Sequence, residues 1–232
     1  MFRVVTRRSS CRVQSVSALL IAAAVMFAVA RPAAADAVLS AVGGTINAGG
    51  PGLTPLVVSF DQSGLIIPYV SGVTNFDHYL LSGPTHITPF FFEWFGNEGS
   101  TTASVTYDLG QLHPINRVAL WNEDDSGIGL LSLFGSSDGS SFFPLVQDVE
   151  PRNNLQGHAY GADVFGFSAT ALRYVRFDLS ECPQPDILPF PACAIGEVAF
   201  SEAAAVSEPA AVALLGLGLT AVAVIRRRRA IR

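Results

Sequence analysis

Residues 104–146 read SVTYDLGQLHPINRVALWNEDDSGIGLLSLFGSSDGSSFFPLV, a stretch of short apolar runs separated by Gly, Pro, Asn, Asp and Ser. At positions 105–109 apolar side chains alternate with polar ones, which is the period of a half-buried strand. Further runs of strand type follow at 115–121, 130–134 and 142–146. Between the last two, Asp138-Gly139 supplies the positive φ angles of a tight turn and predicts a hairpin. Many short strands with closely spaced turn residues predict an all-β sandwich or barrel.

The order of these pieces, together with two more toward the C-terminus, matches a known arrangement. The pieces are Tyr107-Asp108-Leu109-Gly110, Ile115 to Leu120, Phe134 to Gly139 with Phe142, Ala171 to Phe177, and Gly196 to Phe200. In this order they resemble a discoidin-type (coagulation factor C-type, galactose-binding-like) domain over roughly 104–200. The resemblance implies an antiparallel jelly-roll β-sandwich of about eight strands, whose ligands meet loops at one end of the sandwich.

The N-terminal segment, residues 1–35, has the three parts of a secretory signal. Four arginines lie within the first twelve residues, an apolar run covers 16–30, and Ala33-Ala34-Ala35 precedes Asp36. The apolar run is too short for a comfortable membrane span. We therefore expect a signal peptide that is cleaved after Ala35.

The C-terminal segment, residues 204–232, reads as a sorting tail. Ser207-Glu208-Pro209 precedes sixteen small or apolar residues, which run into Arg226-Arg227-Arg228-Arg229. A helix of that length rises about 24 Å, enough to halt in the inner membrane with its arginines at the cytoplasmic side. The tail resembles the PEP-CTERM sorting signal of Gram-negative bacteria, with Ser207 in place of the usual first proline. The resemblance implies an exosortase-type processing enzyme; an ordinary membrane anchor is the alternative.

The middle of the chain, residues 36–203, is expected to form one ectodomain of strongly acidic character. The whole chain has a net charge of −5, and all 14 of its basic residues are arginines. Between Asp36 and Ser207 there are 18 acidic residues but only four arginines. Such a surface repels phosphate backbones, so we expect no nucleic-acid partner, whereas neutral glycans, cations and basic proteins stay open.

Cys182 and Cys193 are the two cysteines that remain after signal removal, and they bracket a proline-rich loop before the last predicted strand. In an oxidising compartment they are expected to form a disulfide. No histidine lies in that loop to suggest a metal site instead.

The acidic turn after Trp121, residues 122–127, partly imitates a calcium loop. Oxygen-bearing side chains stand at alternate positions, Asn122, Asp124 and Ser126, and glycine is sixth. Leu133 stands where an EF-hand needs a bidentate glutamate, which excludes that motif. A structural calcium ion on these three residues and a solvated turn without metal remain the two interpretations.

An aromatic cluster, Phe90-Phe91-Phe92-Glu93-Trp94-Phe95, precedes the clearest strands. Most of these rings are expected in the core, but one ring left at the rim would make a sugar-stacking platform. We assign that role to Trp94, with Asn97, Asn122 and Asp124 as the polar groups that bind sugar hydroxyls.

No nucleophile, acid pair or cofactor motif stands out, so the sequence favours a non-enzymatic binding module. It is expected at the cell envelope, the cell surface or the extracellular matrix, adhesive or bound to extracellular polysaccharide. One alternative is a glycan-active hydrolase that uses two acids among Glu93, Asp124 and Asp125, which would need carboxylates about 5 to 9.5 Å apart across a cleft. The other is a purely structural surface protein.

Overall fold

The computed structural model describes residues 35–185 and 190–204. The predicted signal peptide and sorting tail lie outside the described residues, apart from Ala35 and Ala204 at their inner ends. Within the described part of the chain, none of the helices has the length and apolar character needed to cross a membrane.

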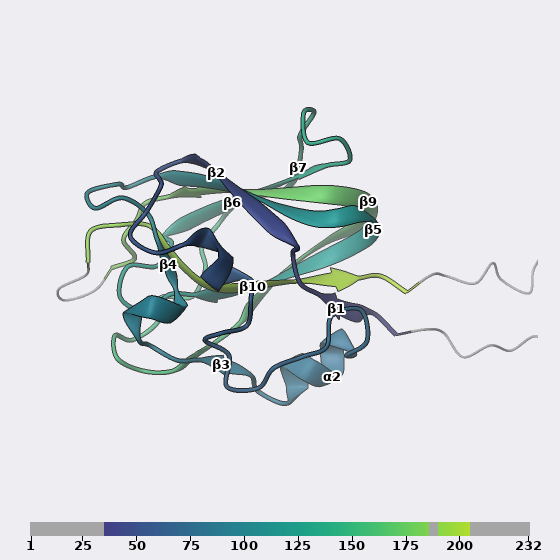
Figure 1. Cartoon of the computed structure of the whole chain (residues 1–232), viewed down its shortest axis with the longest axis horizontal. Helices are drawn as coiled ribbons and strands as arrows, with labels where there is room; N and C mark the ends of the chain where they lie inside the picture. Colours follow the sequence, from purple (N-terminus) through teal and green to yellow (C-terminus); the bar gives the residue numbers. More distant parts are fainter. Residues whose placement is uncertain (1–34, 186–189, 205–232) are drawn as a thin grey trace, which may run out of the picture. The chain divides into compact units, whose positions relative to one another are not determined.

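The ectodomain is an antiparallel β-sandwich whose two layers are both formed by one large sheet, and a small two-stranded sheet lies beside it (Figure 1). The large sheet has eight strands in the order β1, β10, β5, β9, β6, β7, with β2 added beside β5 and β4 beside β10. Its strands are β1 (Ala37–Leu39), β2 (Gly43–Ala48), β4 (Trp94–Phe95), β5 (Ala103–Asn122), β6 (Leu130–Ser136), β7 (Phe143–Val149), β9 (Asp163–Ser180) and β10 (Ala194–Glu202). The small sheet pairs β3 (Thr85–His86) with β8 (Tyr160–Gly161). The jelly-roll class expected from the sequence is confirmed.

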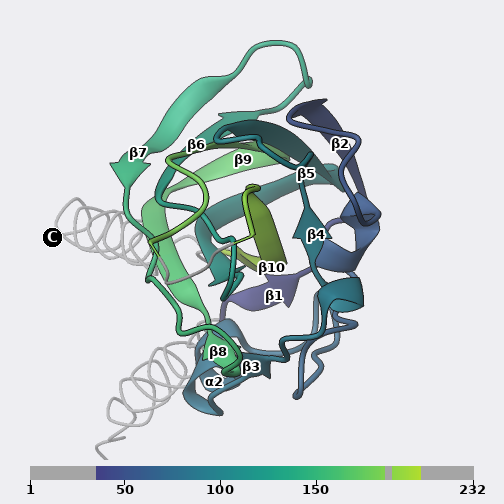
Figure 2. The same cartoon turned by 90° about the vertical axis from the view of Figure 1, so that its left-hand side faces the viewer.

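Two long strands, β5 and β9, belong to both layers of the sandwich. The first half of β5 pairs with β2 and its second half pairs with β10, while β9 follows β5 along both halves. The register between β5 and β9 breaks between Asp108 and His113, where Gly110 adopts a φ of 84°. The strands expected at 105–109 and 115–121 are therefore one bent strand. In Figure 2, β2, β6 and β7 lie on one side of the core and β1 and β10 on the other.

The main core fills the space between the two layers. One layer contributes side chains such as Val105 and Phe177, and the other contributes Val118 and Phe200, all fully buried. Burying side chains of this kind stabilises a fold by about 1.5 to 3 kcal/mol each.

A second, smaller core lies on the other face of the β5–β10 layer. Because side chains alternate along a strand, Ala119 and Trp121 point away from the main core and pack with Phe76 and Tyr79 of helix α2 (Phe76–Leu81). Asn75 caps this helix by accepting a hydrogen bond from the backbone N–H of His78 at 2.7 Å. Helix α2 and the strands before Ala103 were not predicted from the sequence.

The disulfide between Cys182 and Cys193 is confirmed, with a Cα–Cα distance of 4.9 Å. It closes the loop that precedes β10, and Gln184 and Phe190 lie within that loop. The two short 3-10 turns are η1 (Leu56–Ser59) and η2 (Phe90–Phe92). The second of them leads directly into the candidate site.

Candidate functional site

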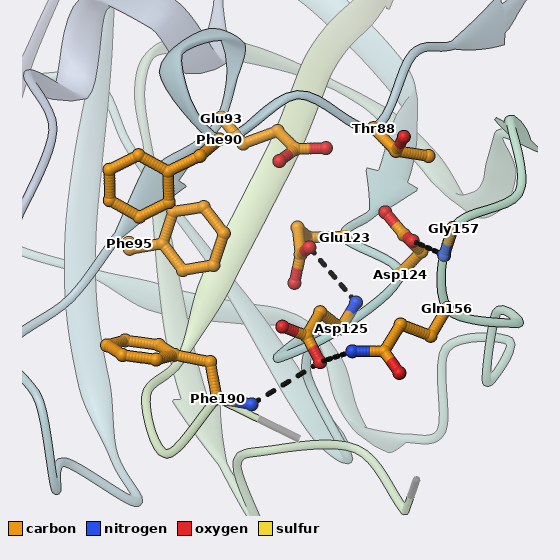
Figure 3. A pocket seen from close by; sticks show the side chains of 10 residues that line it. All are labelled: Thr88, Phe90, Glu93, Phe95, Glu123, Asp124, Asp125, Gln156, Gly157 and Phe190. Atoms are coloured by element: carbon orange, nitrogen blue, oxygen red, sulfur yellow. Dashed lines mark hydrogen bonds between the residues drawn. The ribbon is translucent and has the colours of Figure 1, made fainter. Parts of the chain in front are cut away.

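A pocket of about 270 Å³ lies at the end of the sandwich where β5 ends and β10 begins (Figure 3). Its lining residues come from four separate segments of the chain: Thr88, Phe90, Glu93 and Phe95; Glu123, Asp124 and Asp125; Gln156 and Gly157; and Phe190. Acidic side chains occupy one part of the wall and phenylalanine rings another.

Strand β10 brings the two acidic segments together. Its residue Ile195 is paired with Trp94 of β4 on one side and with Asn122 of β5 on the other. Glu93 precedes Trp94 and Glu123 follows Asn122, so both glutamates are placed at the same end of the sheet.

Glu123 is held by the turn that it begins. One of its carboxylate oxygens accepts a hydrogen bond from the backbone N–H of Asp125 at 3.0 Å. The other accepts from the N–H of Ser126 and from that of Gly127, the latter at 3.1 Å. The side chain is buried, and its orientation is set by the backbone alone.

Glu93 is fully buried, and one of its oxygens accepts a hydrogen bond from Tyr160, whose ring stacks on His86. Tyr160 donates its hydroxyl to Oε1 of Glu93 at 2.6 Å, and the Tyr160 ring stacks on His86 with 5.3 Å between centroids. Nδ1 of His86 lies 2.6 Å from the carbonyl oxygen of Ile87, so this nitrogen carries a proton and donates it there. The other oxygen of Glu93, Oε2, has no hydrogen-bond partner.

Asp124 and Asp125 complete the acidic wall. Asp124 is buried and accepts a hydrogen bond from the backbone N–H of Gly157 through Oδ2 at 2.6 Å, whereas its Oδ1 has no partner. Asp125 accepts from the side-chain amide of Gln156 at 2.7 Å and from the N–H of Phe190 at 3.4 Å.

The carboxylates of Glu93, Glu123 and Asp124 form a compact group, called here the acid cluster. Ligand oxygens of all three lie within 4.8 Å of one another. Burial raises the pKa of Glu93 to about 8, and the negative charges of Asp124 and Asp125 add to the effect. Burial, followed by the charge of Glu93, also raises the pKa of Glu123 to about 8, and burial raises the pKa of Asp124. Each group therefore resists ionisation unless something compensates its charge.

Gln184, from the disulfide loop, fixes the backbone of the two acid-cluster residues in the turn. Its buried side-chain amide donates to the carbonyl oxygens of Glu123 at 3.0 Å and of Asp124 at 2.7 Å. Its oxygen accepts from the amide of Asn122 at 3.2 Å. The disulfide therefore helps to position the site, because it closes the loop that contains this glutamine.

Three phenylalanine rings form the apolar wall. Phe90 stacks on Phe95 with 4.9 Å between ring centroids, and Phe95 meets Phe190 edge-on at 5.9 Å. Phe95 is buried, but Phe90 is 41% exposed at the edge of the pocket. Its neighbour Phe91 is 77% exposed and is not among the lining residues.

The structure places Trp94 differently from the sequence-based expectation. Its side chain is fully buried in the main core, so the interpretation as an exposed sugar platform is wrong. The 3-10 turn η2 breaks the alternation of the aromatic cluster and leaves Phe90 at the rim instead. Asn97 is exposed and does not line the pocket; its side chain accepts from the N–H of Gly52 at 3.1 Å and donates to the carbonyl of Gly50 at 2.8 Å.

Of the three residues proposed for calcium, Asn122, Asp124 and Ser126, only Asp124 keeps an unpartnered oxygen. Oδ1 of Asn122 accepts from the N–H of Ile128 at 2.8 Å, and Oγ of Ser126 donates to the carbonyl of Phe190 at 2.7 Å. Both side chains hold the turn together, which leaves the metal set predicted from the sequence incomplete.

The three acids named for the alternative hydrolase, Glu93, Asp124 and Asp125, do line one pocket. Sequence reasoning missed Glu123 and Gln184 as members of this site. Glu123 lies inside the acidic turn, but the alternate-position pattern selects its neighbours Asn122 and Asp124 as ligands. Gln184 carries no local signal, because its role depends on where the disulfide loop lies.

Similar folds occur among solved structures, although no protein-family model and no curated protein matches the chain. Chitosan-binding module 1 of a chitosanase/glucanase from Paenibacillus sp. IK-5 has a TM-score of 0.44 and 17% identity, covering 70% of this chain and 95% of that one. The CBM32 of AlyQ, in complex with 4,5-unsaturated mannuronic acid, has a TM-score of 0.44 and 19% identity, covering 70% and 96%. CBM32-3 from a family 31 glycoside hydrolase of Clostridium perfringens has a TM-score of 0.38 and 16% identity, and the match covers 47% of this chain and 74% of that one. At this similarity the ligands named belong to those modules alone.

Proposed function

We propose that this chain is an exported, non-enzymatic binding module that takes a saccharide into the pocket between the phenylalanine wall and the acid cluster. The observation that carries the proposal is the arrangement of the pocket, in which aromatic rings and hydrogen-bond acceptors line different parts of one cavity. A sugar ring has apolar C–H faces and an edge of hydroxyl groups. It can place a face on Phe90 while its hydroxyls donate to Asp125 and the acid cluster.

Binding has better support than hydrolysis. Glycosidases need two carboxyl groups about 5 to 5.5 Å or 6.5 to 9.5 Å apart, with one group held protonated and the other ionised. One oxygen from each of Glu93, Glu123 and Asp124 lies within 4.8 Å of the other two, so these carboxylates form one group rather than a pair that flanks a cleft. Burial also moves the pKa of Glu93 and that of Glu123 in the same direction, so their environments do not separate an acid from a base.

The proposal is tested first by a glycan-array screen, followed by affinity electrophoresis in gels that contain the polysaccharides that score. Phe90→Ala is the informative variant, and Phe91→Ala is its matched control, because both rings are exposed neighbours but only Phe90 lines the pocket. A stacking contribution of about 0.5 to 1.5 kcal/mol corresponds to a loss of roughly two- to tenfold in affinity.

Phe90→Ala is therefore expected to bind more weakly, whereas Phe91→Ala binds like the unaltered protein. Both variants should stay folded, with melting temperatures lowered by no more than about 1 to 6 °C, because each ring also contacts a neighbouring phenylalanine. Retained oligosaccharide should keep its chain length, as judged by reducing ends. Shortening of the chain would favour the hydrolase, and the absence of any binding on the array would favour a purely structural role.

Export and sorting complete the proposal, and they rest on the sequence of the two ends. The disulfide in the ectodomain suits an oxidising compartment outside the cytoplasm. We propose that an exosortase-type enzyme processes the tail beyond Glu208-Pro209 while it lies in the inner membrane. Mass spectrometry of the mature protein should then find no peptide with Arg226 to Arg229; its persistence in the envelope would make the tail a plain anchor.

A further inference from the structure

We infer that Glu93, Glu123 and Asp124 form a calcium-binding site at the acidic side of the pocket. The site differs from the set Asn122, Asp124 and Ser126, because it joins two acids of the turn to an acid from the β4 segment. It does not depend on whether a saccharide binds in the pocket.

The first argument is that, among residues 35–185 and 190–204, no lysine or arginine pairs with the acid cluster. This part of the chain contains no lysine, and each of its four arginines is paired with an acid elsewhere at 3.0 Å or less. These pairs are Arg117 with Asp36 and Asp77, Arg152 with Asp163, Arg173 with Asp108, and Arg176 with Asp178. Buried carboxylates are stable only when they are protonated, paired or bound to a cation. The nearest basic side chain is His86, whose Nδ1 lies 3.5 Å from Oε1 of Glu93 but donates its proton to the carbonyl oxygen of Ile87. No lysine or arginine supplies the pairing charge.

The second argument is that two buried oxygens in the cluster have no hydrogen-bond partner. They are Oε2 of Glu93 and Oδ1 of Asp124, on side chains that are 0% and 2% exposed. Figure 3 shows the three carboxylates gathered around one space in the pocket. Unpartnered buried acceptors are rare in native folds and call for a missing donor or ion.

The third argument is that the rest of each carboxylate is already anchored. The second oxygen of Glu93 is held by Tyr160, and that of Asp124 by the N–H of Gly157. The carboxylate of Glu123 is held by backbone N–H groups, and its Oε1, which accepts from only one of them, keeps a second lone pair for a cation. The ligands are thus oriented in advance, in the way that surrounding hydrogen bonds orient metal ligands.

The chemistry of the cluster selects calcium. All three residues offer oxygen, which is the ligand of hard cations. Calcium–oxygen bonds of about 2.3 to 2.6 Å allow two ligands on one ion to be up to about 4.6 to 5.2 Å apart, and the observed limit of 4.8 Å fits. Calcium also accepts irregular sets of six to eight ligands, so water from the open pocket can complete the shell, whereas magnesium demands a near-ideal octahedron.

The test uses the full chain, freed of metal with EDTA and titrated with Ca²⁺ in a calorimeter, with thermal unfolding measured in parallel. We expect saturable binding and a melting temperature that rises with Ca²⁺ concentration. Glu93→Gln and Glu123→Gln should each weaken Ca²⁺ binding by at least about 10- to 100-fold and lose the Ca²⁺-dependent rise. In EDTA Glu93→Gln should melt at the same temperature as the unaltered protein or higher, because an amide cannot carry a buried charge. Glu123→Gln should melt at a lower temperature, because its amide nitrogen cannot accept the backbone N–H bonds that hold the carboxylate.

The matched control is Glu197→Gln. Glu197 is also a fully buried glutamate with one unpartnered oxygen, but it does not line the pocket. This variant should keep the tight Ca²⁺ binding of the unaltered chain. Three results would overturn the inference: no Ca²⁺ response at all, unchanged binding in both pocket variants, or loss of binding in Glu197→Gln alone. Should Glu93→Gln fail to fold, Asp124→Asn replaces it with the same expectation.

A calcium ion in this position would also offer its open coordination sites to saccharide hydroxyls, a step that rests on the proposed function. Removing Ca²⁺ should then abolish glycan retention, and adding it back should restore it. Phe90→Ala separates the two ideas, because it is expected to lose glycan affinity and keep Ca²⁺ binding. Glycan retention that persists in EDTA would overturn the contact between ion and sugar.

Discussion

Replacing Trp94 with alanine should unfold the ectodomain at a much lower temperature. The indole is fully buried in the main core and sits close to the backbone of Gly52, where an added Cβ would lie 2.8 Å from the indole nitrogen. Truncating a buried tryptophan to alanine costs about 3 to 5 kcal/mol, because the apolar surface is lost and a cavity remains. In a domain of this size each kcal/mol shifts the melting temperature by roughly 2 to 4 °C, so the expected fall is about 6 to 20 °C.

The companion variant Trp94→Phe tests whether the loss of stability follows from lost packing in the core. It keeps an aromatic ring in the core and removes the indole N–H, which has no hydrogen-bond partner. A buried donor without a partner costs about 1 to 3 kcal/mol, so its removal offsets part of the lost packing. Trp94→Phe should therefore destabilise by clearly less than Trp94→Ala, as measured by circular dichroism during thermal and denaturant unfolding. A Trp94→Ala protein that loses less than about 1 kcal/mol would refute the placement of this side chain in the core.

Three further changes have defined outcomes. The double variant Cys182→Ser/Cys193→Ser should lose about 2 to 3 kcal/mol in urea unfolding, and unaltered stability would contradict the entropic role of the loop. Burial holds the pKa of Glu197 well above its ordinary value, so the stability that it contributes is complete below about pH 4.5 and is lost as the pH rises toward the folded-state pKa. In EDTA, the free energy of unfolding of Glu197→Gln should equal that of the unaltered protein at pH 4 and be larger at pH 8. The difference should grow by up to about 1.4 kcal/mol for each pH unit between the unfolded-state and folded-state pKa values. Equal free energies of unfolding at pH 8 would argue against a buried carboxyl. In Gly64→Ala the new methyl group would collide with the ring of the buried His86, so overpacking should cost about 1 to 3 kcal/mol. A melting temperature within about 1 °C of that of the unaltered protein would show that the ring can move aside.

In the aromatic cluster, residues 90–95, the alternation pattern of the sequence does not predict which ring stays exposed. The sequence predicts that most of these rings are buried, and Trp94 and Phe95 are. Which ring stays outside depends on a 3-10 turn at Phe90–Phe92, which breaks the two-residue period on which alternation arguments rest. Phe90 rather than Trp94 is therefore the ring at the edge of the pocket.

The acidic turn shows a similar division. Oxygen-rich residues after a predicted strand mark this segment as a candidate site, and Glu123, Asp124 and Asp125 line the pocket. Side chains at alternate positions were expected to share a ligand, but Asn122 and Ser126 instead hydrogen-bond within the turn and its neighbouring loops. A turn must first satisfy its own buried backbone groups, and only the side chains left over from that task can face a ligand.

The sequence by itself determined the all-β class, several strands of the sandwich and the disulfide. These features follow from local periodicity, from turn residues and from having one available cysteine pair, and none of them requires knowing which strands are neighbours. The tertiary structure alone decided the acid cluster. Glu93 and Glu123 are thirty positions apart, and they meet because Ile195 of β10 pairs with Trp94 on one side and Asn122 on the other. Such long-range strand pairing depends on the packing of the whole core, so no short stretch of the sequence predicts it.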